Sequence, residues 1–197
     1  MDFETEYLPA LYSCRRCPYV EGKPVTGPVA DADVLLVGQA PGPHEISQDR
    51  PFAHTAGRRL FEWFESIGWS EERFRHAVHI CAVTRCFPGR TPDGKSDRLP
   101  SRREIENCAP WLDSEIEMLE PDLIILVGGL AIGQFLGKHK LKDVVGTRLP
   151  GERAGRKFDL IALPHPSGRS TWLNKPEHEK LLRSALNLIR THPAMKR

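Results

Sequence analysis

Apolar residues along the chain gather in short, nearly continuous runs that alternate with longer segments of helical character. The short runs are typical of strands that are buried on both faces of a sheet. They lie at residues 31–38, 77–84, 122–129 and 157–164. The other segments are predicted helices, at residues 55–68, 101–120, 130–137 and 175–192. Strands that alternate with helices predict an α/β fold: a three-layer sandwich with a central, mainly parallel four-stranded sheet flanked by helices.

Two of the predicted helices carry signals in their first turns. Ser101 and Glu104 have the spacing of a capping box, in which each side chain binds the other residue's backbone amide. Pro176 suits the first turn of the last helix, where a backbone N–H has no partner within the helix. Both signals support helices that begin at these positions.

Length and composition predict one domain spanning residues 1–197. The chain of 197 residues is long enough for a full core, and its 40% hydrophobic and 27% charged residues are ordinary for a globular protein. No apolar run reaches the roughly 18 residues of a membrane-spanning helix. The first residues lack the basic and apolar regions of a signal peptide. We therefore expect a cytoplasmic monomer that has no membrane partner.

Polar stretches rich in glycine and proline follow three of the predicted strands. They read GQAPGPHE (38–45), RCFPG (85–89) and HPSGRS (165–170). In a parallel sheet, ligands bind outside the carboxyl ends of the strands, so the three stretches predict one pocket at that edge. His165, at the mouth of the last strand, is either a polar group of this pocket or a structural histidine held by hydrogen bonds.

Basic residues are concentrated in one stretch, although the net charge of the whole chain is only +2. Residues 84–103 hold two aspartates and six basic residues, a local charge of +4; the basic residues are Arg85, Arg90, Lys95, Arg98, Arg102 and Arg103. The charge of the whole chain is too mild to indicate nucleic acid binding. Taken alone, the stretch fits a solvated loop as well as it fits a surface for phosphate groups.

Two of the five cysteines, Cys14 and Cys17, form a C-x-x-C motif in an irregular N-terminal segment. Structural disulfides are rare in the cytosol, and a redox C-x-x-C should open a helix after a strand. The motif therefore favours a metal or cluster, which needs two more ligands. Cys86 and Cys108 are available, whereas Cys81 lies within a predicted strand and fits core packing. Zinc and a four-iron cluster both suit four such ligands, and the spacing does not separate them.

Taken in order, these motifs resemble those of uracil-DNA glycosylases, especially the iron–sulfur type 4 enzymes. VLLVGQAPGPHE (34–45) and RPFAHTAGRRLFEWF (50–64) resemble the first motif region of that family. VTRCFPG (83–89) with ENCAPWL (106–112) is similar to its second cysteine pair, and HPSGRS to its second motif. Each motif alone is weak evidence for the family, but the order of all the motifs, from about Tyr12 to Arg190, is specific to it.

The resemblance implies a DNA repair enzyme that acts in base excision repair. Such an enzyme is a monofunctional glycosylase that flips uracil out of DNA and hydrolyses its N-glycosidic bond, leaving an abasic site. The resemblance also implies a 4Fe-4S cluster, and its ligands would be Cys14, Cys17, Cys86 and Cys108. The cluster would tie the N-terminal segment, residues 1–30, to the stretch 84–103, whose basic side chains would then face DNA phosphates.

The resemblance further implies roles for individual residues. The candidate catalytic residues are His165, Gln39, Glu45 and His54. The candidate substrate-binding residues are Gly38, Ala40, Pro41, Gly42, Phe52, Ala82, Ser167, Gly168, Arg169 and Ser170. His165 would donate a hydrogen bond to the uracil oxygen on which negative charge collects. Phe52 would stack on the flipped base, residues 39–42 would supply backbone amides and place the attacking water, and residues 166–170 would hold the duplex open.

The chain departs from the type 4 pattern at positions that bear on base choice. Ala82 stands where those enzymes carry an Asn that reads the uracil edge, and Gln39 stands where they carry Glu. His54 and Thr55 replace a Gly and an Arg. Because an apolar wall discriminates weakly among polar edges, we expect an enzyme that accepts uracil and also other deaminated or 5-substituted bases.

Three alternatives keep part of this interpretation. The first is an iron–sulfur DNA-binding protein of the same fold that lacks glycosylase activity. The second is an enzyme of the same fold that acts on another damaged base. The third is a zinc-stabilised α/β nucleotide-binding protein, which would lack the visible absorption of an iron–sulfur cluster.

Overall fold

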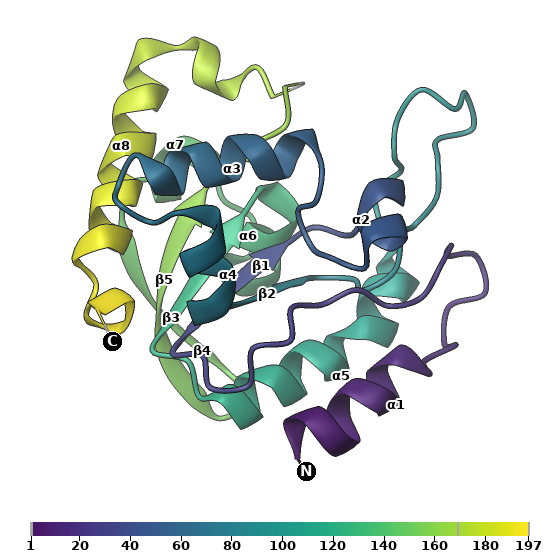
Figure 1. Cartoon of the computed structure of the whole chain (residues 1–197). Helices are drawn as coiled ribbons and strands as arrows, with labels where there is room; N and C mark the ends of the chain where they lie inside the picture. The colour runs from purple at the N-terminus through teal and green to yellow at the C-terminus, as the bar shows by residue number, and fades with distance from the viewer. Residues whose placement is uncertain (1, 169, 197) are drawn as a thin grey trace.

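A single five-stranded sheet forms the centre of the molecule (Figure 1). The structure is a computed structural model that describes residues 2–168 and 170–196. The strand order is β2-β1-β3-β5-β4. The strands are β1 (Val34–Gly38), β2 (Val78–Ala82), β3 (Leu123–Val127), β4 (Arg148–Arg153) and β5 (Arg156–Leu163).

The four predicted strands are present and parallel. Val34 of β1 pairs with Val78 of β2 on one side and with Leu123 of β3 on the other, and Leu123 faces Asp159 of β5. Every residue of β1, β2 and β3 is buried, because helices cover both faces of the sheet. This burial explains the unbroken apolar runs, and the predicted α/β fold class is confirmed.

The predicted number of strands is wrong, because β4 was not recognised in the sequence. β4 pairs antiparallel with β5 at the edge of the sheet, and its residues alternate between exposed and half-buried. Its sequence RLPGER contains a proline and a glycine, which an edge strand tolerates and an inner strand does not. Ala154 and Gly155 join β4 to β5 with φ angles of 52° and 71°, values that suit a tight hairpin turn.

The four predicted helices also form, with small shifts at their ends. They are α3 (Thr55–Glu65), α5 (Arg102–Leu119), α6 (Gly129–Leu136) and α8 (Pro176–Thr191). Ser101 is the N-cap of α5: its amide donates to the Glu104 carboxylate at 2.7 Å, and its hydroxyl accepts from the Glu104 amide at 3.3 Å. The predicted capping box and the first-turn Pro176 are therefore both confirmed.

The structure contains further short helices that the sequence pattern did not predict. Each spans three to seven residues, so none is long enough to display a helical hydrophobic period. They are η1 (Phe3–Tyr7), α1 (Leu8–Tyr12), α2 (Pro43–Gln48), α4 (Glu71–Ala77), α7 (Leu141–Val144), η2 (Trp172–Asn174) and η3 (Pro193–Lys196).

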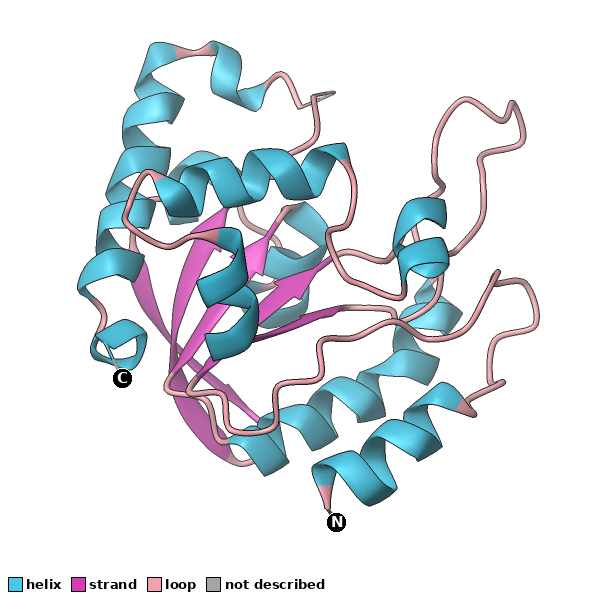
Figure 2. Cartoon of the chain, viewed as in Figure 1, coloured by secondary structure: helices cyan, strands magenta, loops and turns pink. Residues whose placement is uncertain are grey.

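Helices lie on both sides of the sheet and complete three layers (Figure 2). The main core joins the strands to buried side chains such as Phe64 of α3, Phe74 of α4, Ile116 of α5, Ile132 of α6 and Ile189 of α8. The chain moves along the sheet in one direction from β1 to β2 and in the other from β2 to β3 and β5. Because crossovers between parallel strands are generally right-handed, this reversal places helices on both faces. Within the described residues, no helix has the length and apolar composition that crossing a membrane requires.

The N-terminal segment packs along α5 and forms a second small core (Figure 1). Phe3, Tyr7 and Leu11 are buried there, with Trp111 of α5 packed against them. The Tyr7 hydroxyl donates to the Trp111 carbonyl at 3.1 Å and to the Glu115 carboxylate at 2.9 Å. This segment is thus docked on the body of the protein by aromatic packing and by hydrogen bonds.

Candidate functional site

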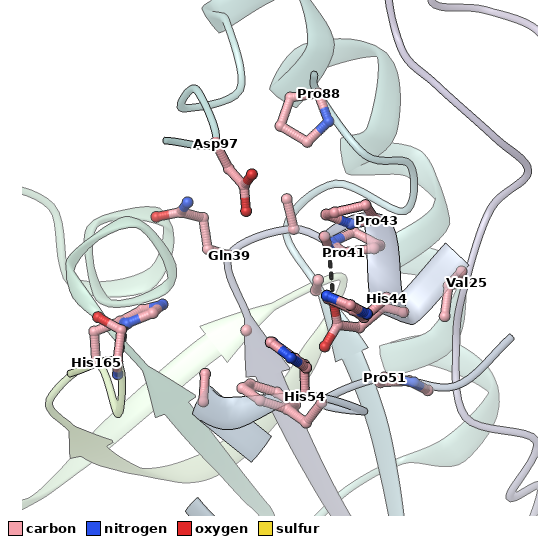
Figure 3. Close-up of a pocket in the computed structure, with 18 of the residues that line it drawn as sticks. Val25, Gln39, Pro41, Pro43, His44, Pro51, His54, Pro88, Asp97 and His165 are labelled. Carbon is pink, nitrogen blue, oxygen red and sulfur yellow. Dashed lines mark hydrogen bonds between the residues drawn. The ribbon is translucent and has the colours of Figure 1, made fainter. Parts of the chain in front are cut away.

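A pocket of about 420 Å³ opens at the carboxyl ends of the parallel strands (Figure 3). Residues that follow β1, β2 and β5 line it together with residues 51–52 and 54–56 and the stretch that precedes α5. The predicted meeting of three polar stretches at one pocket is therefore confirmed. The predicted site residues that line it are Gly38, Gln39, Ala40, Pro41, Gly42, Glu45, Phe52, His54, Ala82, His165 and Ser167.

Two of the remaining predicted substrate-binding residues, Gly168 and Ser170, lie in the turn after His165. Gly168 and Ser170 are absent from the pocket lining among the described residues. The Ser170 amide donates to the Ser167 carbonyl at 3.0 Å, which closes the turn. Arg169 lies outside the described residues, so the structure gives no position for it.

His165 enters the pocket as a neutral hydrogen-bond donor. It follows β5 by two residues, and its Nδ1 accepts a hydrogen bond from the Ser167 amide at 3.2 Å. An Nδ1 that accepts carries no proton, so Nε2 must carry the ring proton. Burial lowers the pKa of His165, which favours the same neutral form. The ring therefore presents an N–H group without carrying a positive charge.

Gly128, directly after β3, makes room for this imidazole. A Cβ at position 128 would stand 3.0 Å from Cδ2 of His165, closer than side chains normally approach. The residue also has a φ of 86°, a backbone conformation that favours glycine. Two independent reasons thus require glycine beside His165.

Glu45 braces two walls of the pocket. One carboxylate oxygen accepts the Gly42 amide at 3.0 Å, and the other accepts the Ala53 amide at 2.9 Å. The first bond belongs to the loop after β1 and the second to the segment before α3. Glu45 therefore holds both loops in register, and each of its oxygens already binds a backbone N–H group.

Phe52 lies against the end of β1 in an uncommon backbone conformation. Its φ is 51°, in the left-handed region that residues with a side chain seldom adopt. A Cβ placed on Gly38 would stand 2.9 Å from Cζ of the Phe52 ring. The ring thus packs directly on the last residue of β1 and offers an aromatic surface to the pocket.

His44 and His54 stack on each other at the exposed rim of the pocket. Their ring centroids lie 3.7 Å apart, and their planes are inclined by 14°. His54 is the N-cap residue of α3, but its side chain makes no capping hydrogen bond. Its imidazole stacks on the partner ring, and its Nδ1 lies 3.3 Å from the hydroxyl of Thr55 in the first turn of α3.

Sequence reasoning missed Asp97, which lines the pocket from the basic stretch (Figure 3). Asp97 forms an isolated antiparallel bridge with Arg90, and their side chains form an ion pair at 3.5 Å. The turn that returns the chain to the pocket is closed by the Gly94 amide, which donates to the Thr91 carbonyl at 2.8 Å. The sequence TPDG (91–94) is a turn signal that could have revealed this reversal.

The expectation that all basic residues of 84–103 face DNA is wrong for Arg85. Its side chain is only 1% exposed and forms an ion pair with Glu115. Arg85 follows the end of β2 by three residues, and its side chain is buried against Glu115 of α5. By contrast, the Arg102 side chain is 93% exposed and pairs with its helix neighbour Glu106.

Arg85 and Glu115 belong to a buried polar network. Glu115 accepts hydrogen bonds from the hydroxyls of Tyr7 at 2.9 Å and Thr26 at 3.3 Å. It also lies 3.2 Å from Nε2 of His79. Burial alone would raise the pKa of Glu115, but Arg85 and His79 together lower it to about 2. The network therefore holds a carboxylate in its charged form inside the protein.

A second cavity of about 80 Å³ lies beside this network. The four cysteines predicted as ligands line it: Cys14, Cys17, Cys86 and Cys108. Burial, followed by the neighbouring thiols, raises the pKa of Cys86 to about 12. The Cys108 sulfur accepts the Arg85 amide at 3.3 Å, and the Cys17 sulfur accepts the Asn107 amide at 3.5 Å. The structure thus brings together four thiols from three distant segments.

Cys81 lies apart from this cavity, within β2. Its ligand atom and those of His79 and Glu115 are within 4.8 Å of one another. Because Glu115 already binds the Arg85 guanidinium, we interpret this group as part of the polar network rather than as a metal site. The prediction that Cys81 packs in the core agrees with its 1% exposure.

Comparisons with known proteins agree with the resemblance read from the motifs. A family model described as the uracil DNA glycosylase superfamily matches residues 24–188. A type-4 uracil-DNA glycosylase of Archaeoglobus fulgidus is 30% identical over 165 residues, which cover 80% of this chain and 78% of that protein. A type-4 enzyme of Pyrobaculum aerophilum is 32% identical, with 80% and 79% covered. A type-5 uracil-DNA glycosylase of the same organism is 26% identical, with 64% and 66% covered.

Proposed function

The chain belongs to the uracil DNA glycosylase superfamily, and from this premise we propose that it releases uracil from DNA by hydrolysis of the N-glycosidic bond. The observation that carries the proposal is the neutral His165 donor in the pocket at the strand ends. DNA is then the partner, and the abasic site is the product.

The chemistry assigned to His165 follows from charge development in the reaction. As the bond between C1′ and the base nitrogen breaks, negative charge collects on the base and positive charge on the sugar. The Nε2–H group of His165 would donate to a base carbonyl oxygen, and this bond strengthens as the oxygen becomes more negative. A neutral imidazole supplies the donor without protonating the leaving base.

We assign the remaining steps to side chains on the other walls of the pocket. Phe52 would stack on the flipped base, and the Glu45 brace would keep the amides of the loop after β1 in place. Gln39 would orient the attacking water. Asp97 would accept a proton from that water as its oxygen bonds to C1′, because Asp97 is a carboxylate of the pocket lining that pairs with Arg90 through one oxygen, Oδ1.

We further propose that Cys14, Cys17, Cys86 and Cys108 bind a 4Fe-4S cluster. The fit is supported by one cavity that four thiols line and by two buried Arg85 nitrogens, Nε and Nη1, that lack hydrogen-bond partners in the described part of the chain. Such a donor set suits an anionic cluster with four thiolates. The cluster would supply structural cross-linking of distant segments and take no part in base release.

The range of bases is the finer part of the proposal. Ala82 lines the pocket at the end of β2 and offers a methyl group where a polar side chain could read the base. An apolar contact separates similar substrates by only about 1–3 kcal/mol, far less than a hydrogen-bonding side chain achieves. We therefore propose that the enzyme accepts hypoxanthine, xanthine or 5-substituted uracil in addition to uracil.

The test is an excision assay on duplex oligonucleotides that carry each of these bases, followed by alkaline strand scission. We expect the wild-type protein to release uracil and at least one other base, and Ala82→Asn to narrow this range. Strict uracil specificity that Ala82→Asn leaves unchanged would contradict the proposed breadth. Binding to uracil DNA without release of any base would favour the DNA-binding protein that lacks activity.

A further inference from the structure

The segment that carries Phe52 is held from two sides by side chains of neighbouring helices. On one side, the Ala53 amide donates to Glu45 of α2 at 2.9 Å. On the other side, Arg75 of α4 donates through Nη1 to the Pro51 carbonyl at 2.9 Å and through Nη2 to the Phe52 carbonyl at 3.0 Å. The peptide groups before and after Phe52 are therefore both fixed.

Arg75 is itself locked in one orientation. Its Nε donates to Glu71 at 2.8 Å, and its guanidinium lies 4.4 Å from the centroid of the Phe61 ring. The side chain is 15% exposed, so little water competes for these bonds. All three guanidinium nitrogens thus have assigned partners, and two of them are used on the backbone around Phe52.

This backbone needs external support because its conformation is unfavourable. A φ of 51° at a phenylalanine costs free energy that surrounding contacts must offset. Gly57 of α3 adds to the constraint, since a Cβ there would stand 1.9 Å from the Phe52 carbonyl oxygen. The carbonyl therefore lies close both to the Arg75 guanidinium and to the first turn of α3.

We propose that Arg75 is a positioning residue that presets the Phe52 ring for stacking on the flipped base. The inference rests on the proposed stacking role of Phe52. Arg75 does not contact the base; it holds the Pro51 and Phe52 carbonyls so that the ring lies on Gly38 before DNA arrives. Lysine can replace it only in part, because a single ammonium group lacks the fork of donors that holds two adjacent carbonyls.

The decisive experiment combines hydrogen exchange with a double-mutant cycle. Arg75→Met keeps the aliphatic packing of the side chain but removes every donor, and Arg73→Met is the matched control. Arg73 lies on the same helix and stacks on Trp69 at 4.0 Å, away from Phe52. Exchange of the peptide covering residues 50–56 is measured without DNA, and single-turnover uracil release is measured for Arg75→Met, Phe52→Ala and the double variant.

We expect Arg75→Met to accelerate exchange in residues 50–56 and to slow release by roughly 5- to 150-fold, the range that loss of one base–aromatic stack produces. Arg75→Lys should give an intermediate effect, and the control should change neither readout. The double variant should be no slower than Phe52→Ala alone, because both changes remove the same stack. A purely structural role would instead add its loss to that of Phe52→Ala.

Three results would overturn the inference: unchanged exchange in Arg75→Met, a fully additive double variant, or wild-type rates in Phe52→Ala. Thermal melting of each variant identifies any that fail to fold, and Arg75→Lys then takes the place of Arg75→Met. A wild-type protein that releases no base would refute the proposed function instead. The exchange measurement would still decide whether Arg75 fixes the segment.

Discussion

Loss of the Glu115 charge should destabilise the protein more than almost any other single change. Glu115→Gln keeps the size of the side chain but removes the carboxylate that pairs with the Arg85 guanidinium, whose side chain is only 1% exposed. Breaking one partner of a buried ion pair costs about 3–5 kcal/mol, against a total stability of about 5–15 kcal/mol for a typical domain. For a chain of this length, that loss lowers the melting temperature by roughly 6–20 °C.

Removal of both charges should destabilise the protein less than removal of the Glu115 charge alone, because the neighbouring polar groups keep other hydrogen-bond partners. In Arg85→Met/Glu115→Leu, the Tyr7 hydroxyl keeps the Trp111 carbonyl as an acceptor at 3.1 Å. His79 likewise keeps the Thr26 hydroxyl at 3.2 Å. Neither a guanidinium nor a carboxylate of this ion pair is left buried alone, so the double variant should recover at least half of the loss caused by Glu115→Gln.

The assay is thermal unfolding followed by far-UV circular dichroism, with iron content measured in parallel. Glu117→Gln, on the exposed face of the same helix, is the matched control and should shift the melting temperature by less than about 2 °C. A Glu115→Gln variant that melts within a few degrees of wild type, or a double variant that is worse than the single one, would refute the reasoning.

Other predictions concern the pocket, the cysteines and pH. His165→Ala should slow single-turnover base release by roughly 10²- to 10³-fold while DNA binding persists, the usual loss for one oxyanion donor; an unchanged rate would return His165 to a structural role. Cys86→Ser should lose iron and visible absorption, whereas Cys81→Ser should keep both; the opposite pattern would reassign the ligands. Glu115 has a folded-state pKa of about 2 against an ordinary 4.5, so its contribution is complete above about pH 4.5 and is lost as the pH falls towards 2. Acid unfolding curves that coincide for wild type and Glu115→Gln in that window would contradict this.

The hydrophobic pattern was sufficient for the elements that bury long apolar surfaces. The parallel strands carry continuous apolar runs, and the longer helices carry apolar residues at helical spacing, so the pattern indicates the type of each element. β4 carries no such signal, because an edge strand that is half exposed needs no apolar run. The short helix α2 is likewise held by Glu45 and its loop rather than by a hydrophobic face.

The residues of the candidate site could be predicted from the sequence only where they belong to an unusual local stretch. The stretches around Gln39 and His165 look unusual in the sequence, and both line the pocket. Asp97 and Arg75 do not look unusual, because their positions depend on a loop reversal and on the packing of two helices. Arg85 was misread for the same reason: a count of charges does not show which side chain points inward.

The docking of the N-terminal segment on α5 has a consequence for biosynthesis. The Tyr7 hydroxyl binds the Trp111 carbonyl, 104 residues further along the chain. At a synthesis rate of about 5–20 residues per second, the nascent segment waits roughly 5–20 s for that partner to be made. Throughout this interval its thiols, Cys14 and Cys17, are accessible to oxidants and stray metal ions. We therefore expect oxidation of these thiols, or binding of the wrong metal ion, to occur mainly before α5 leaves the ribosome.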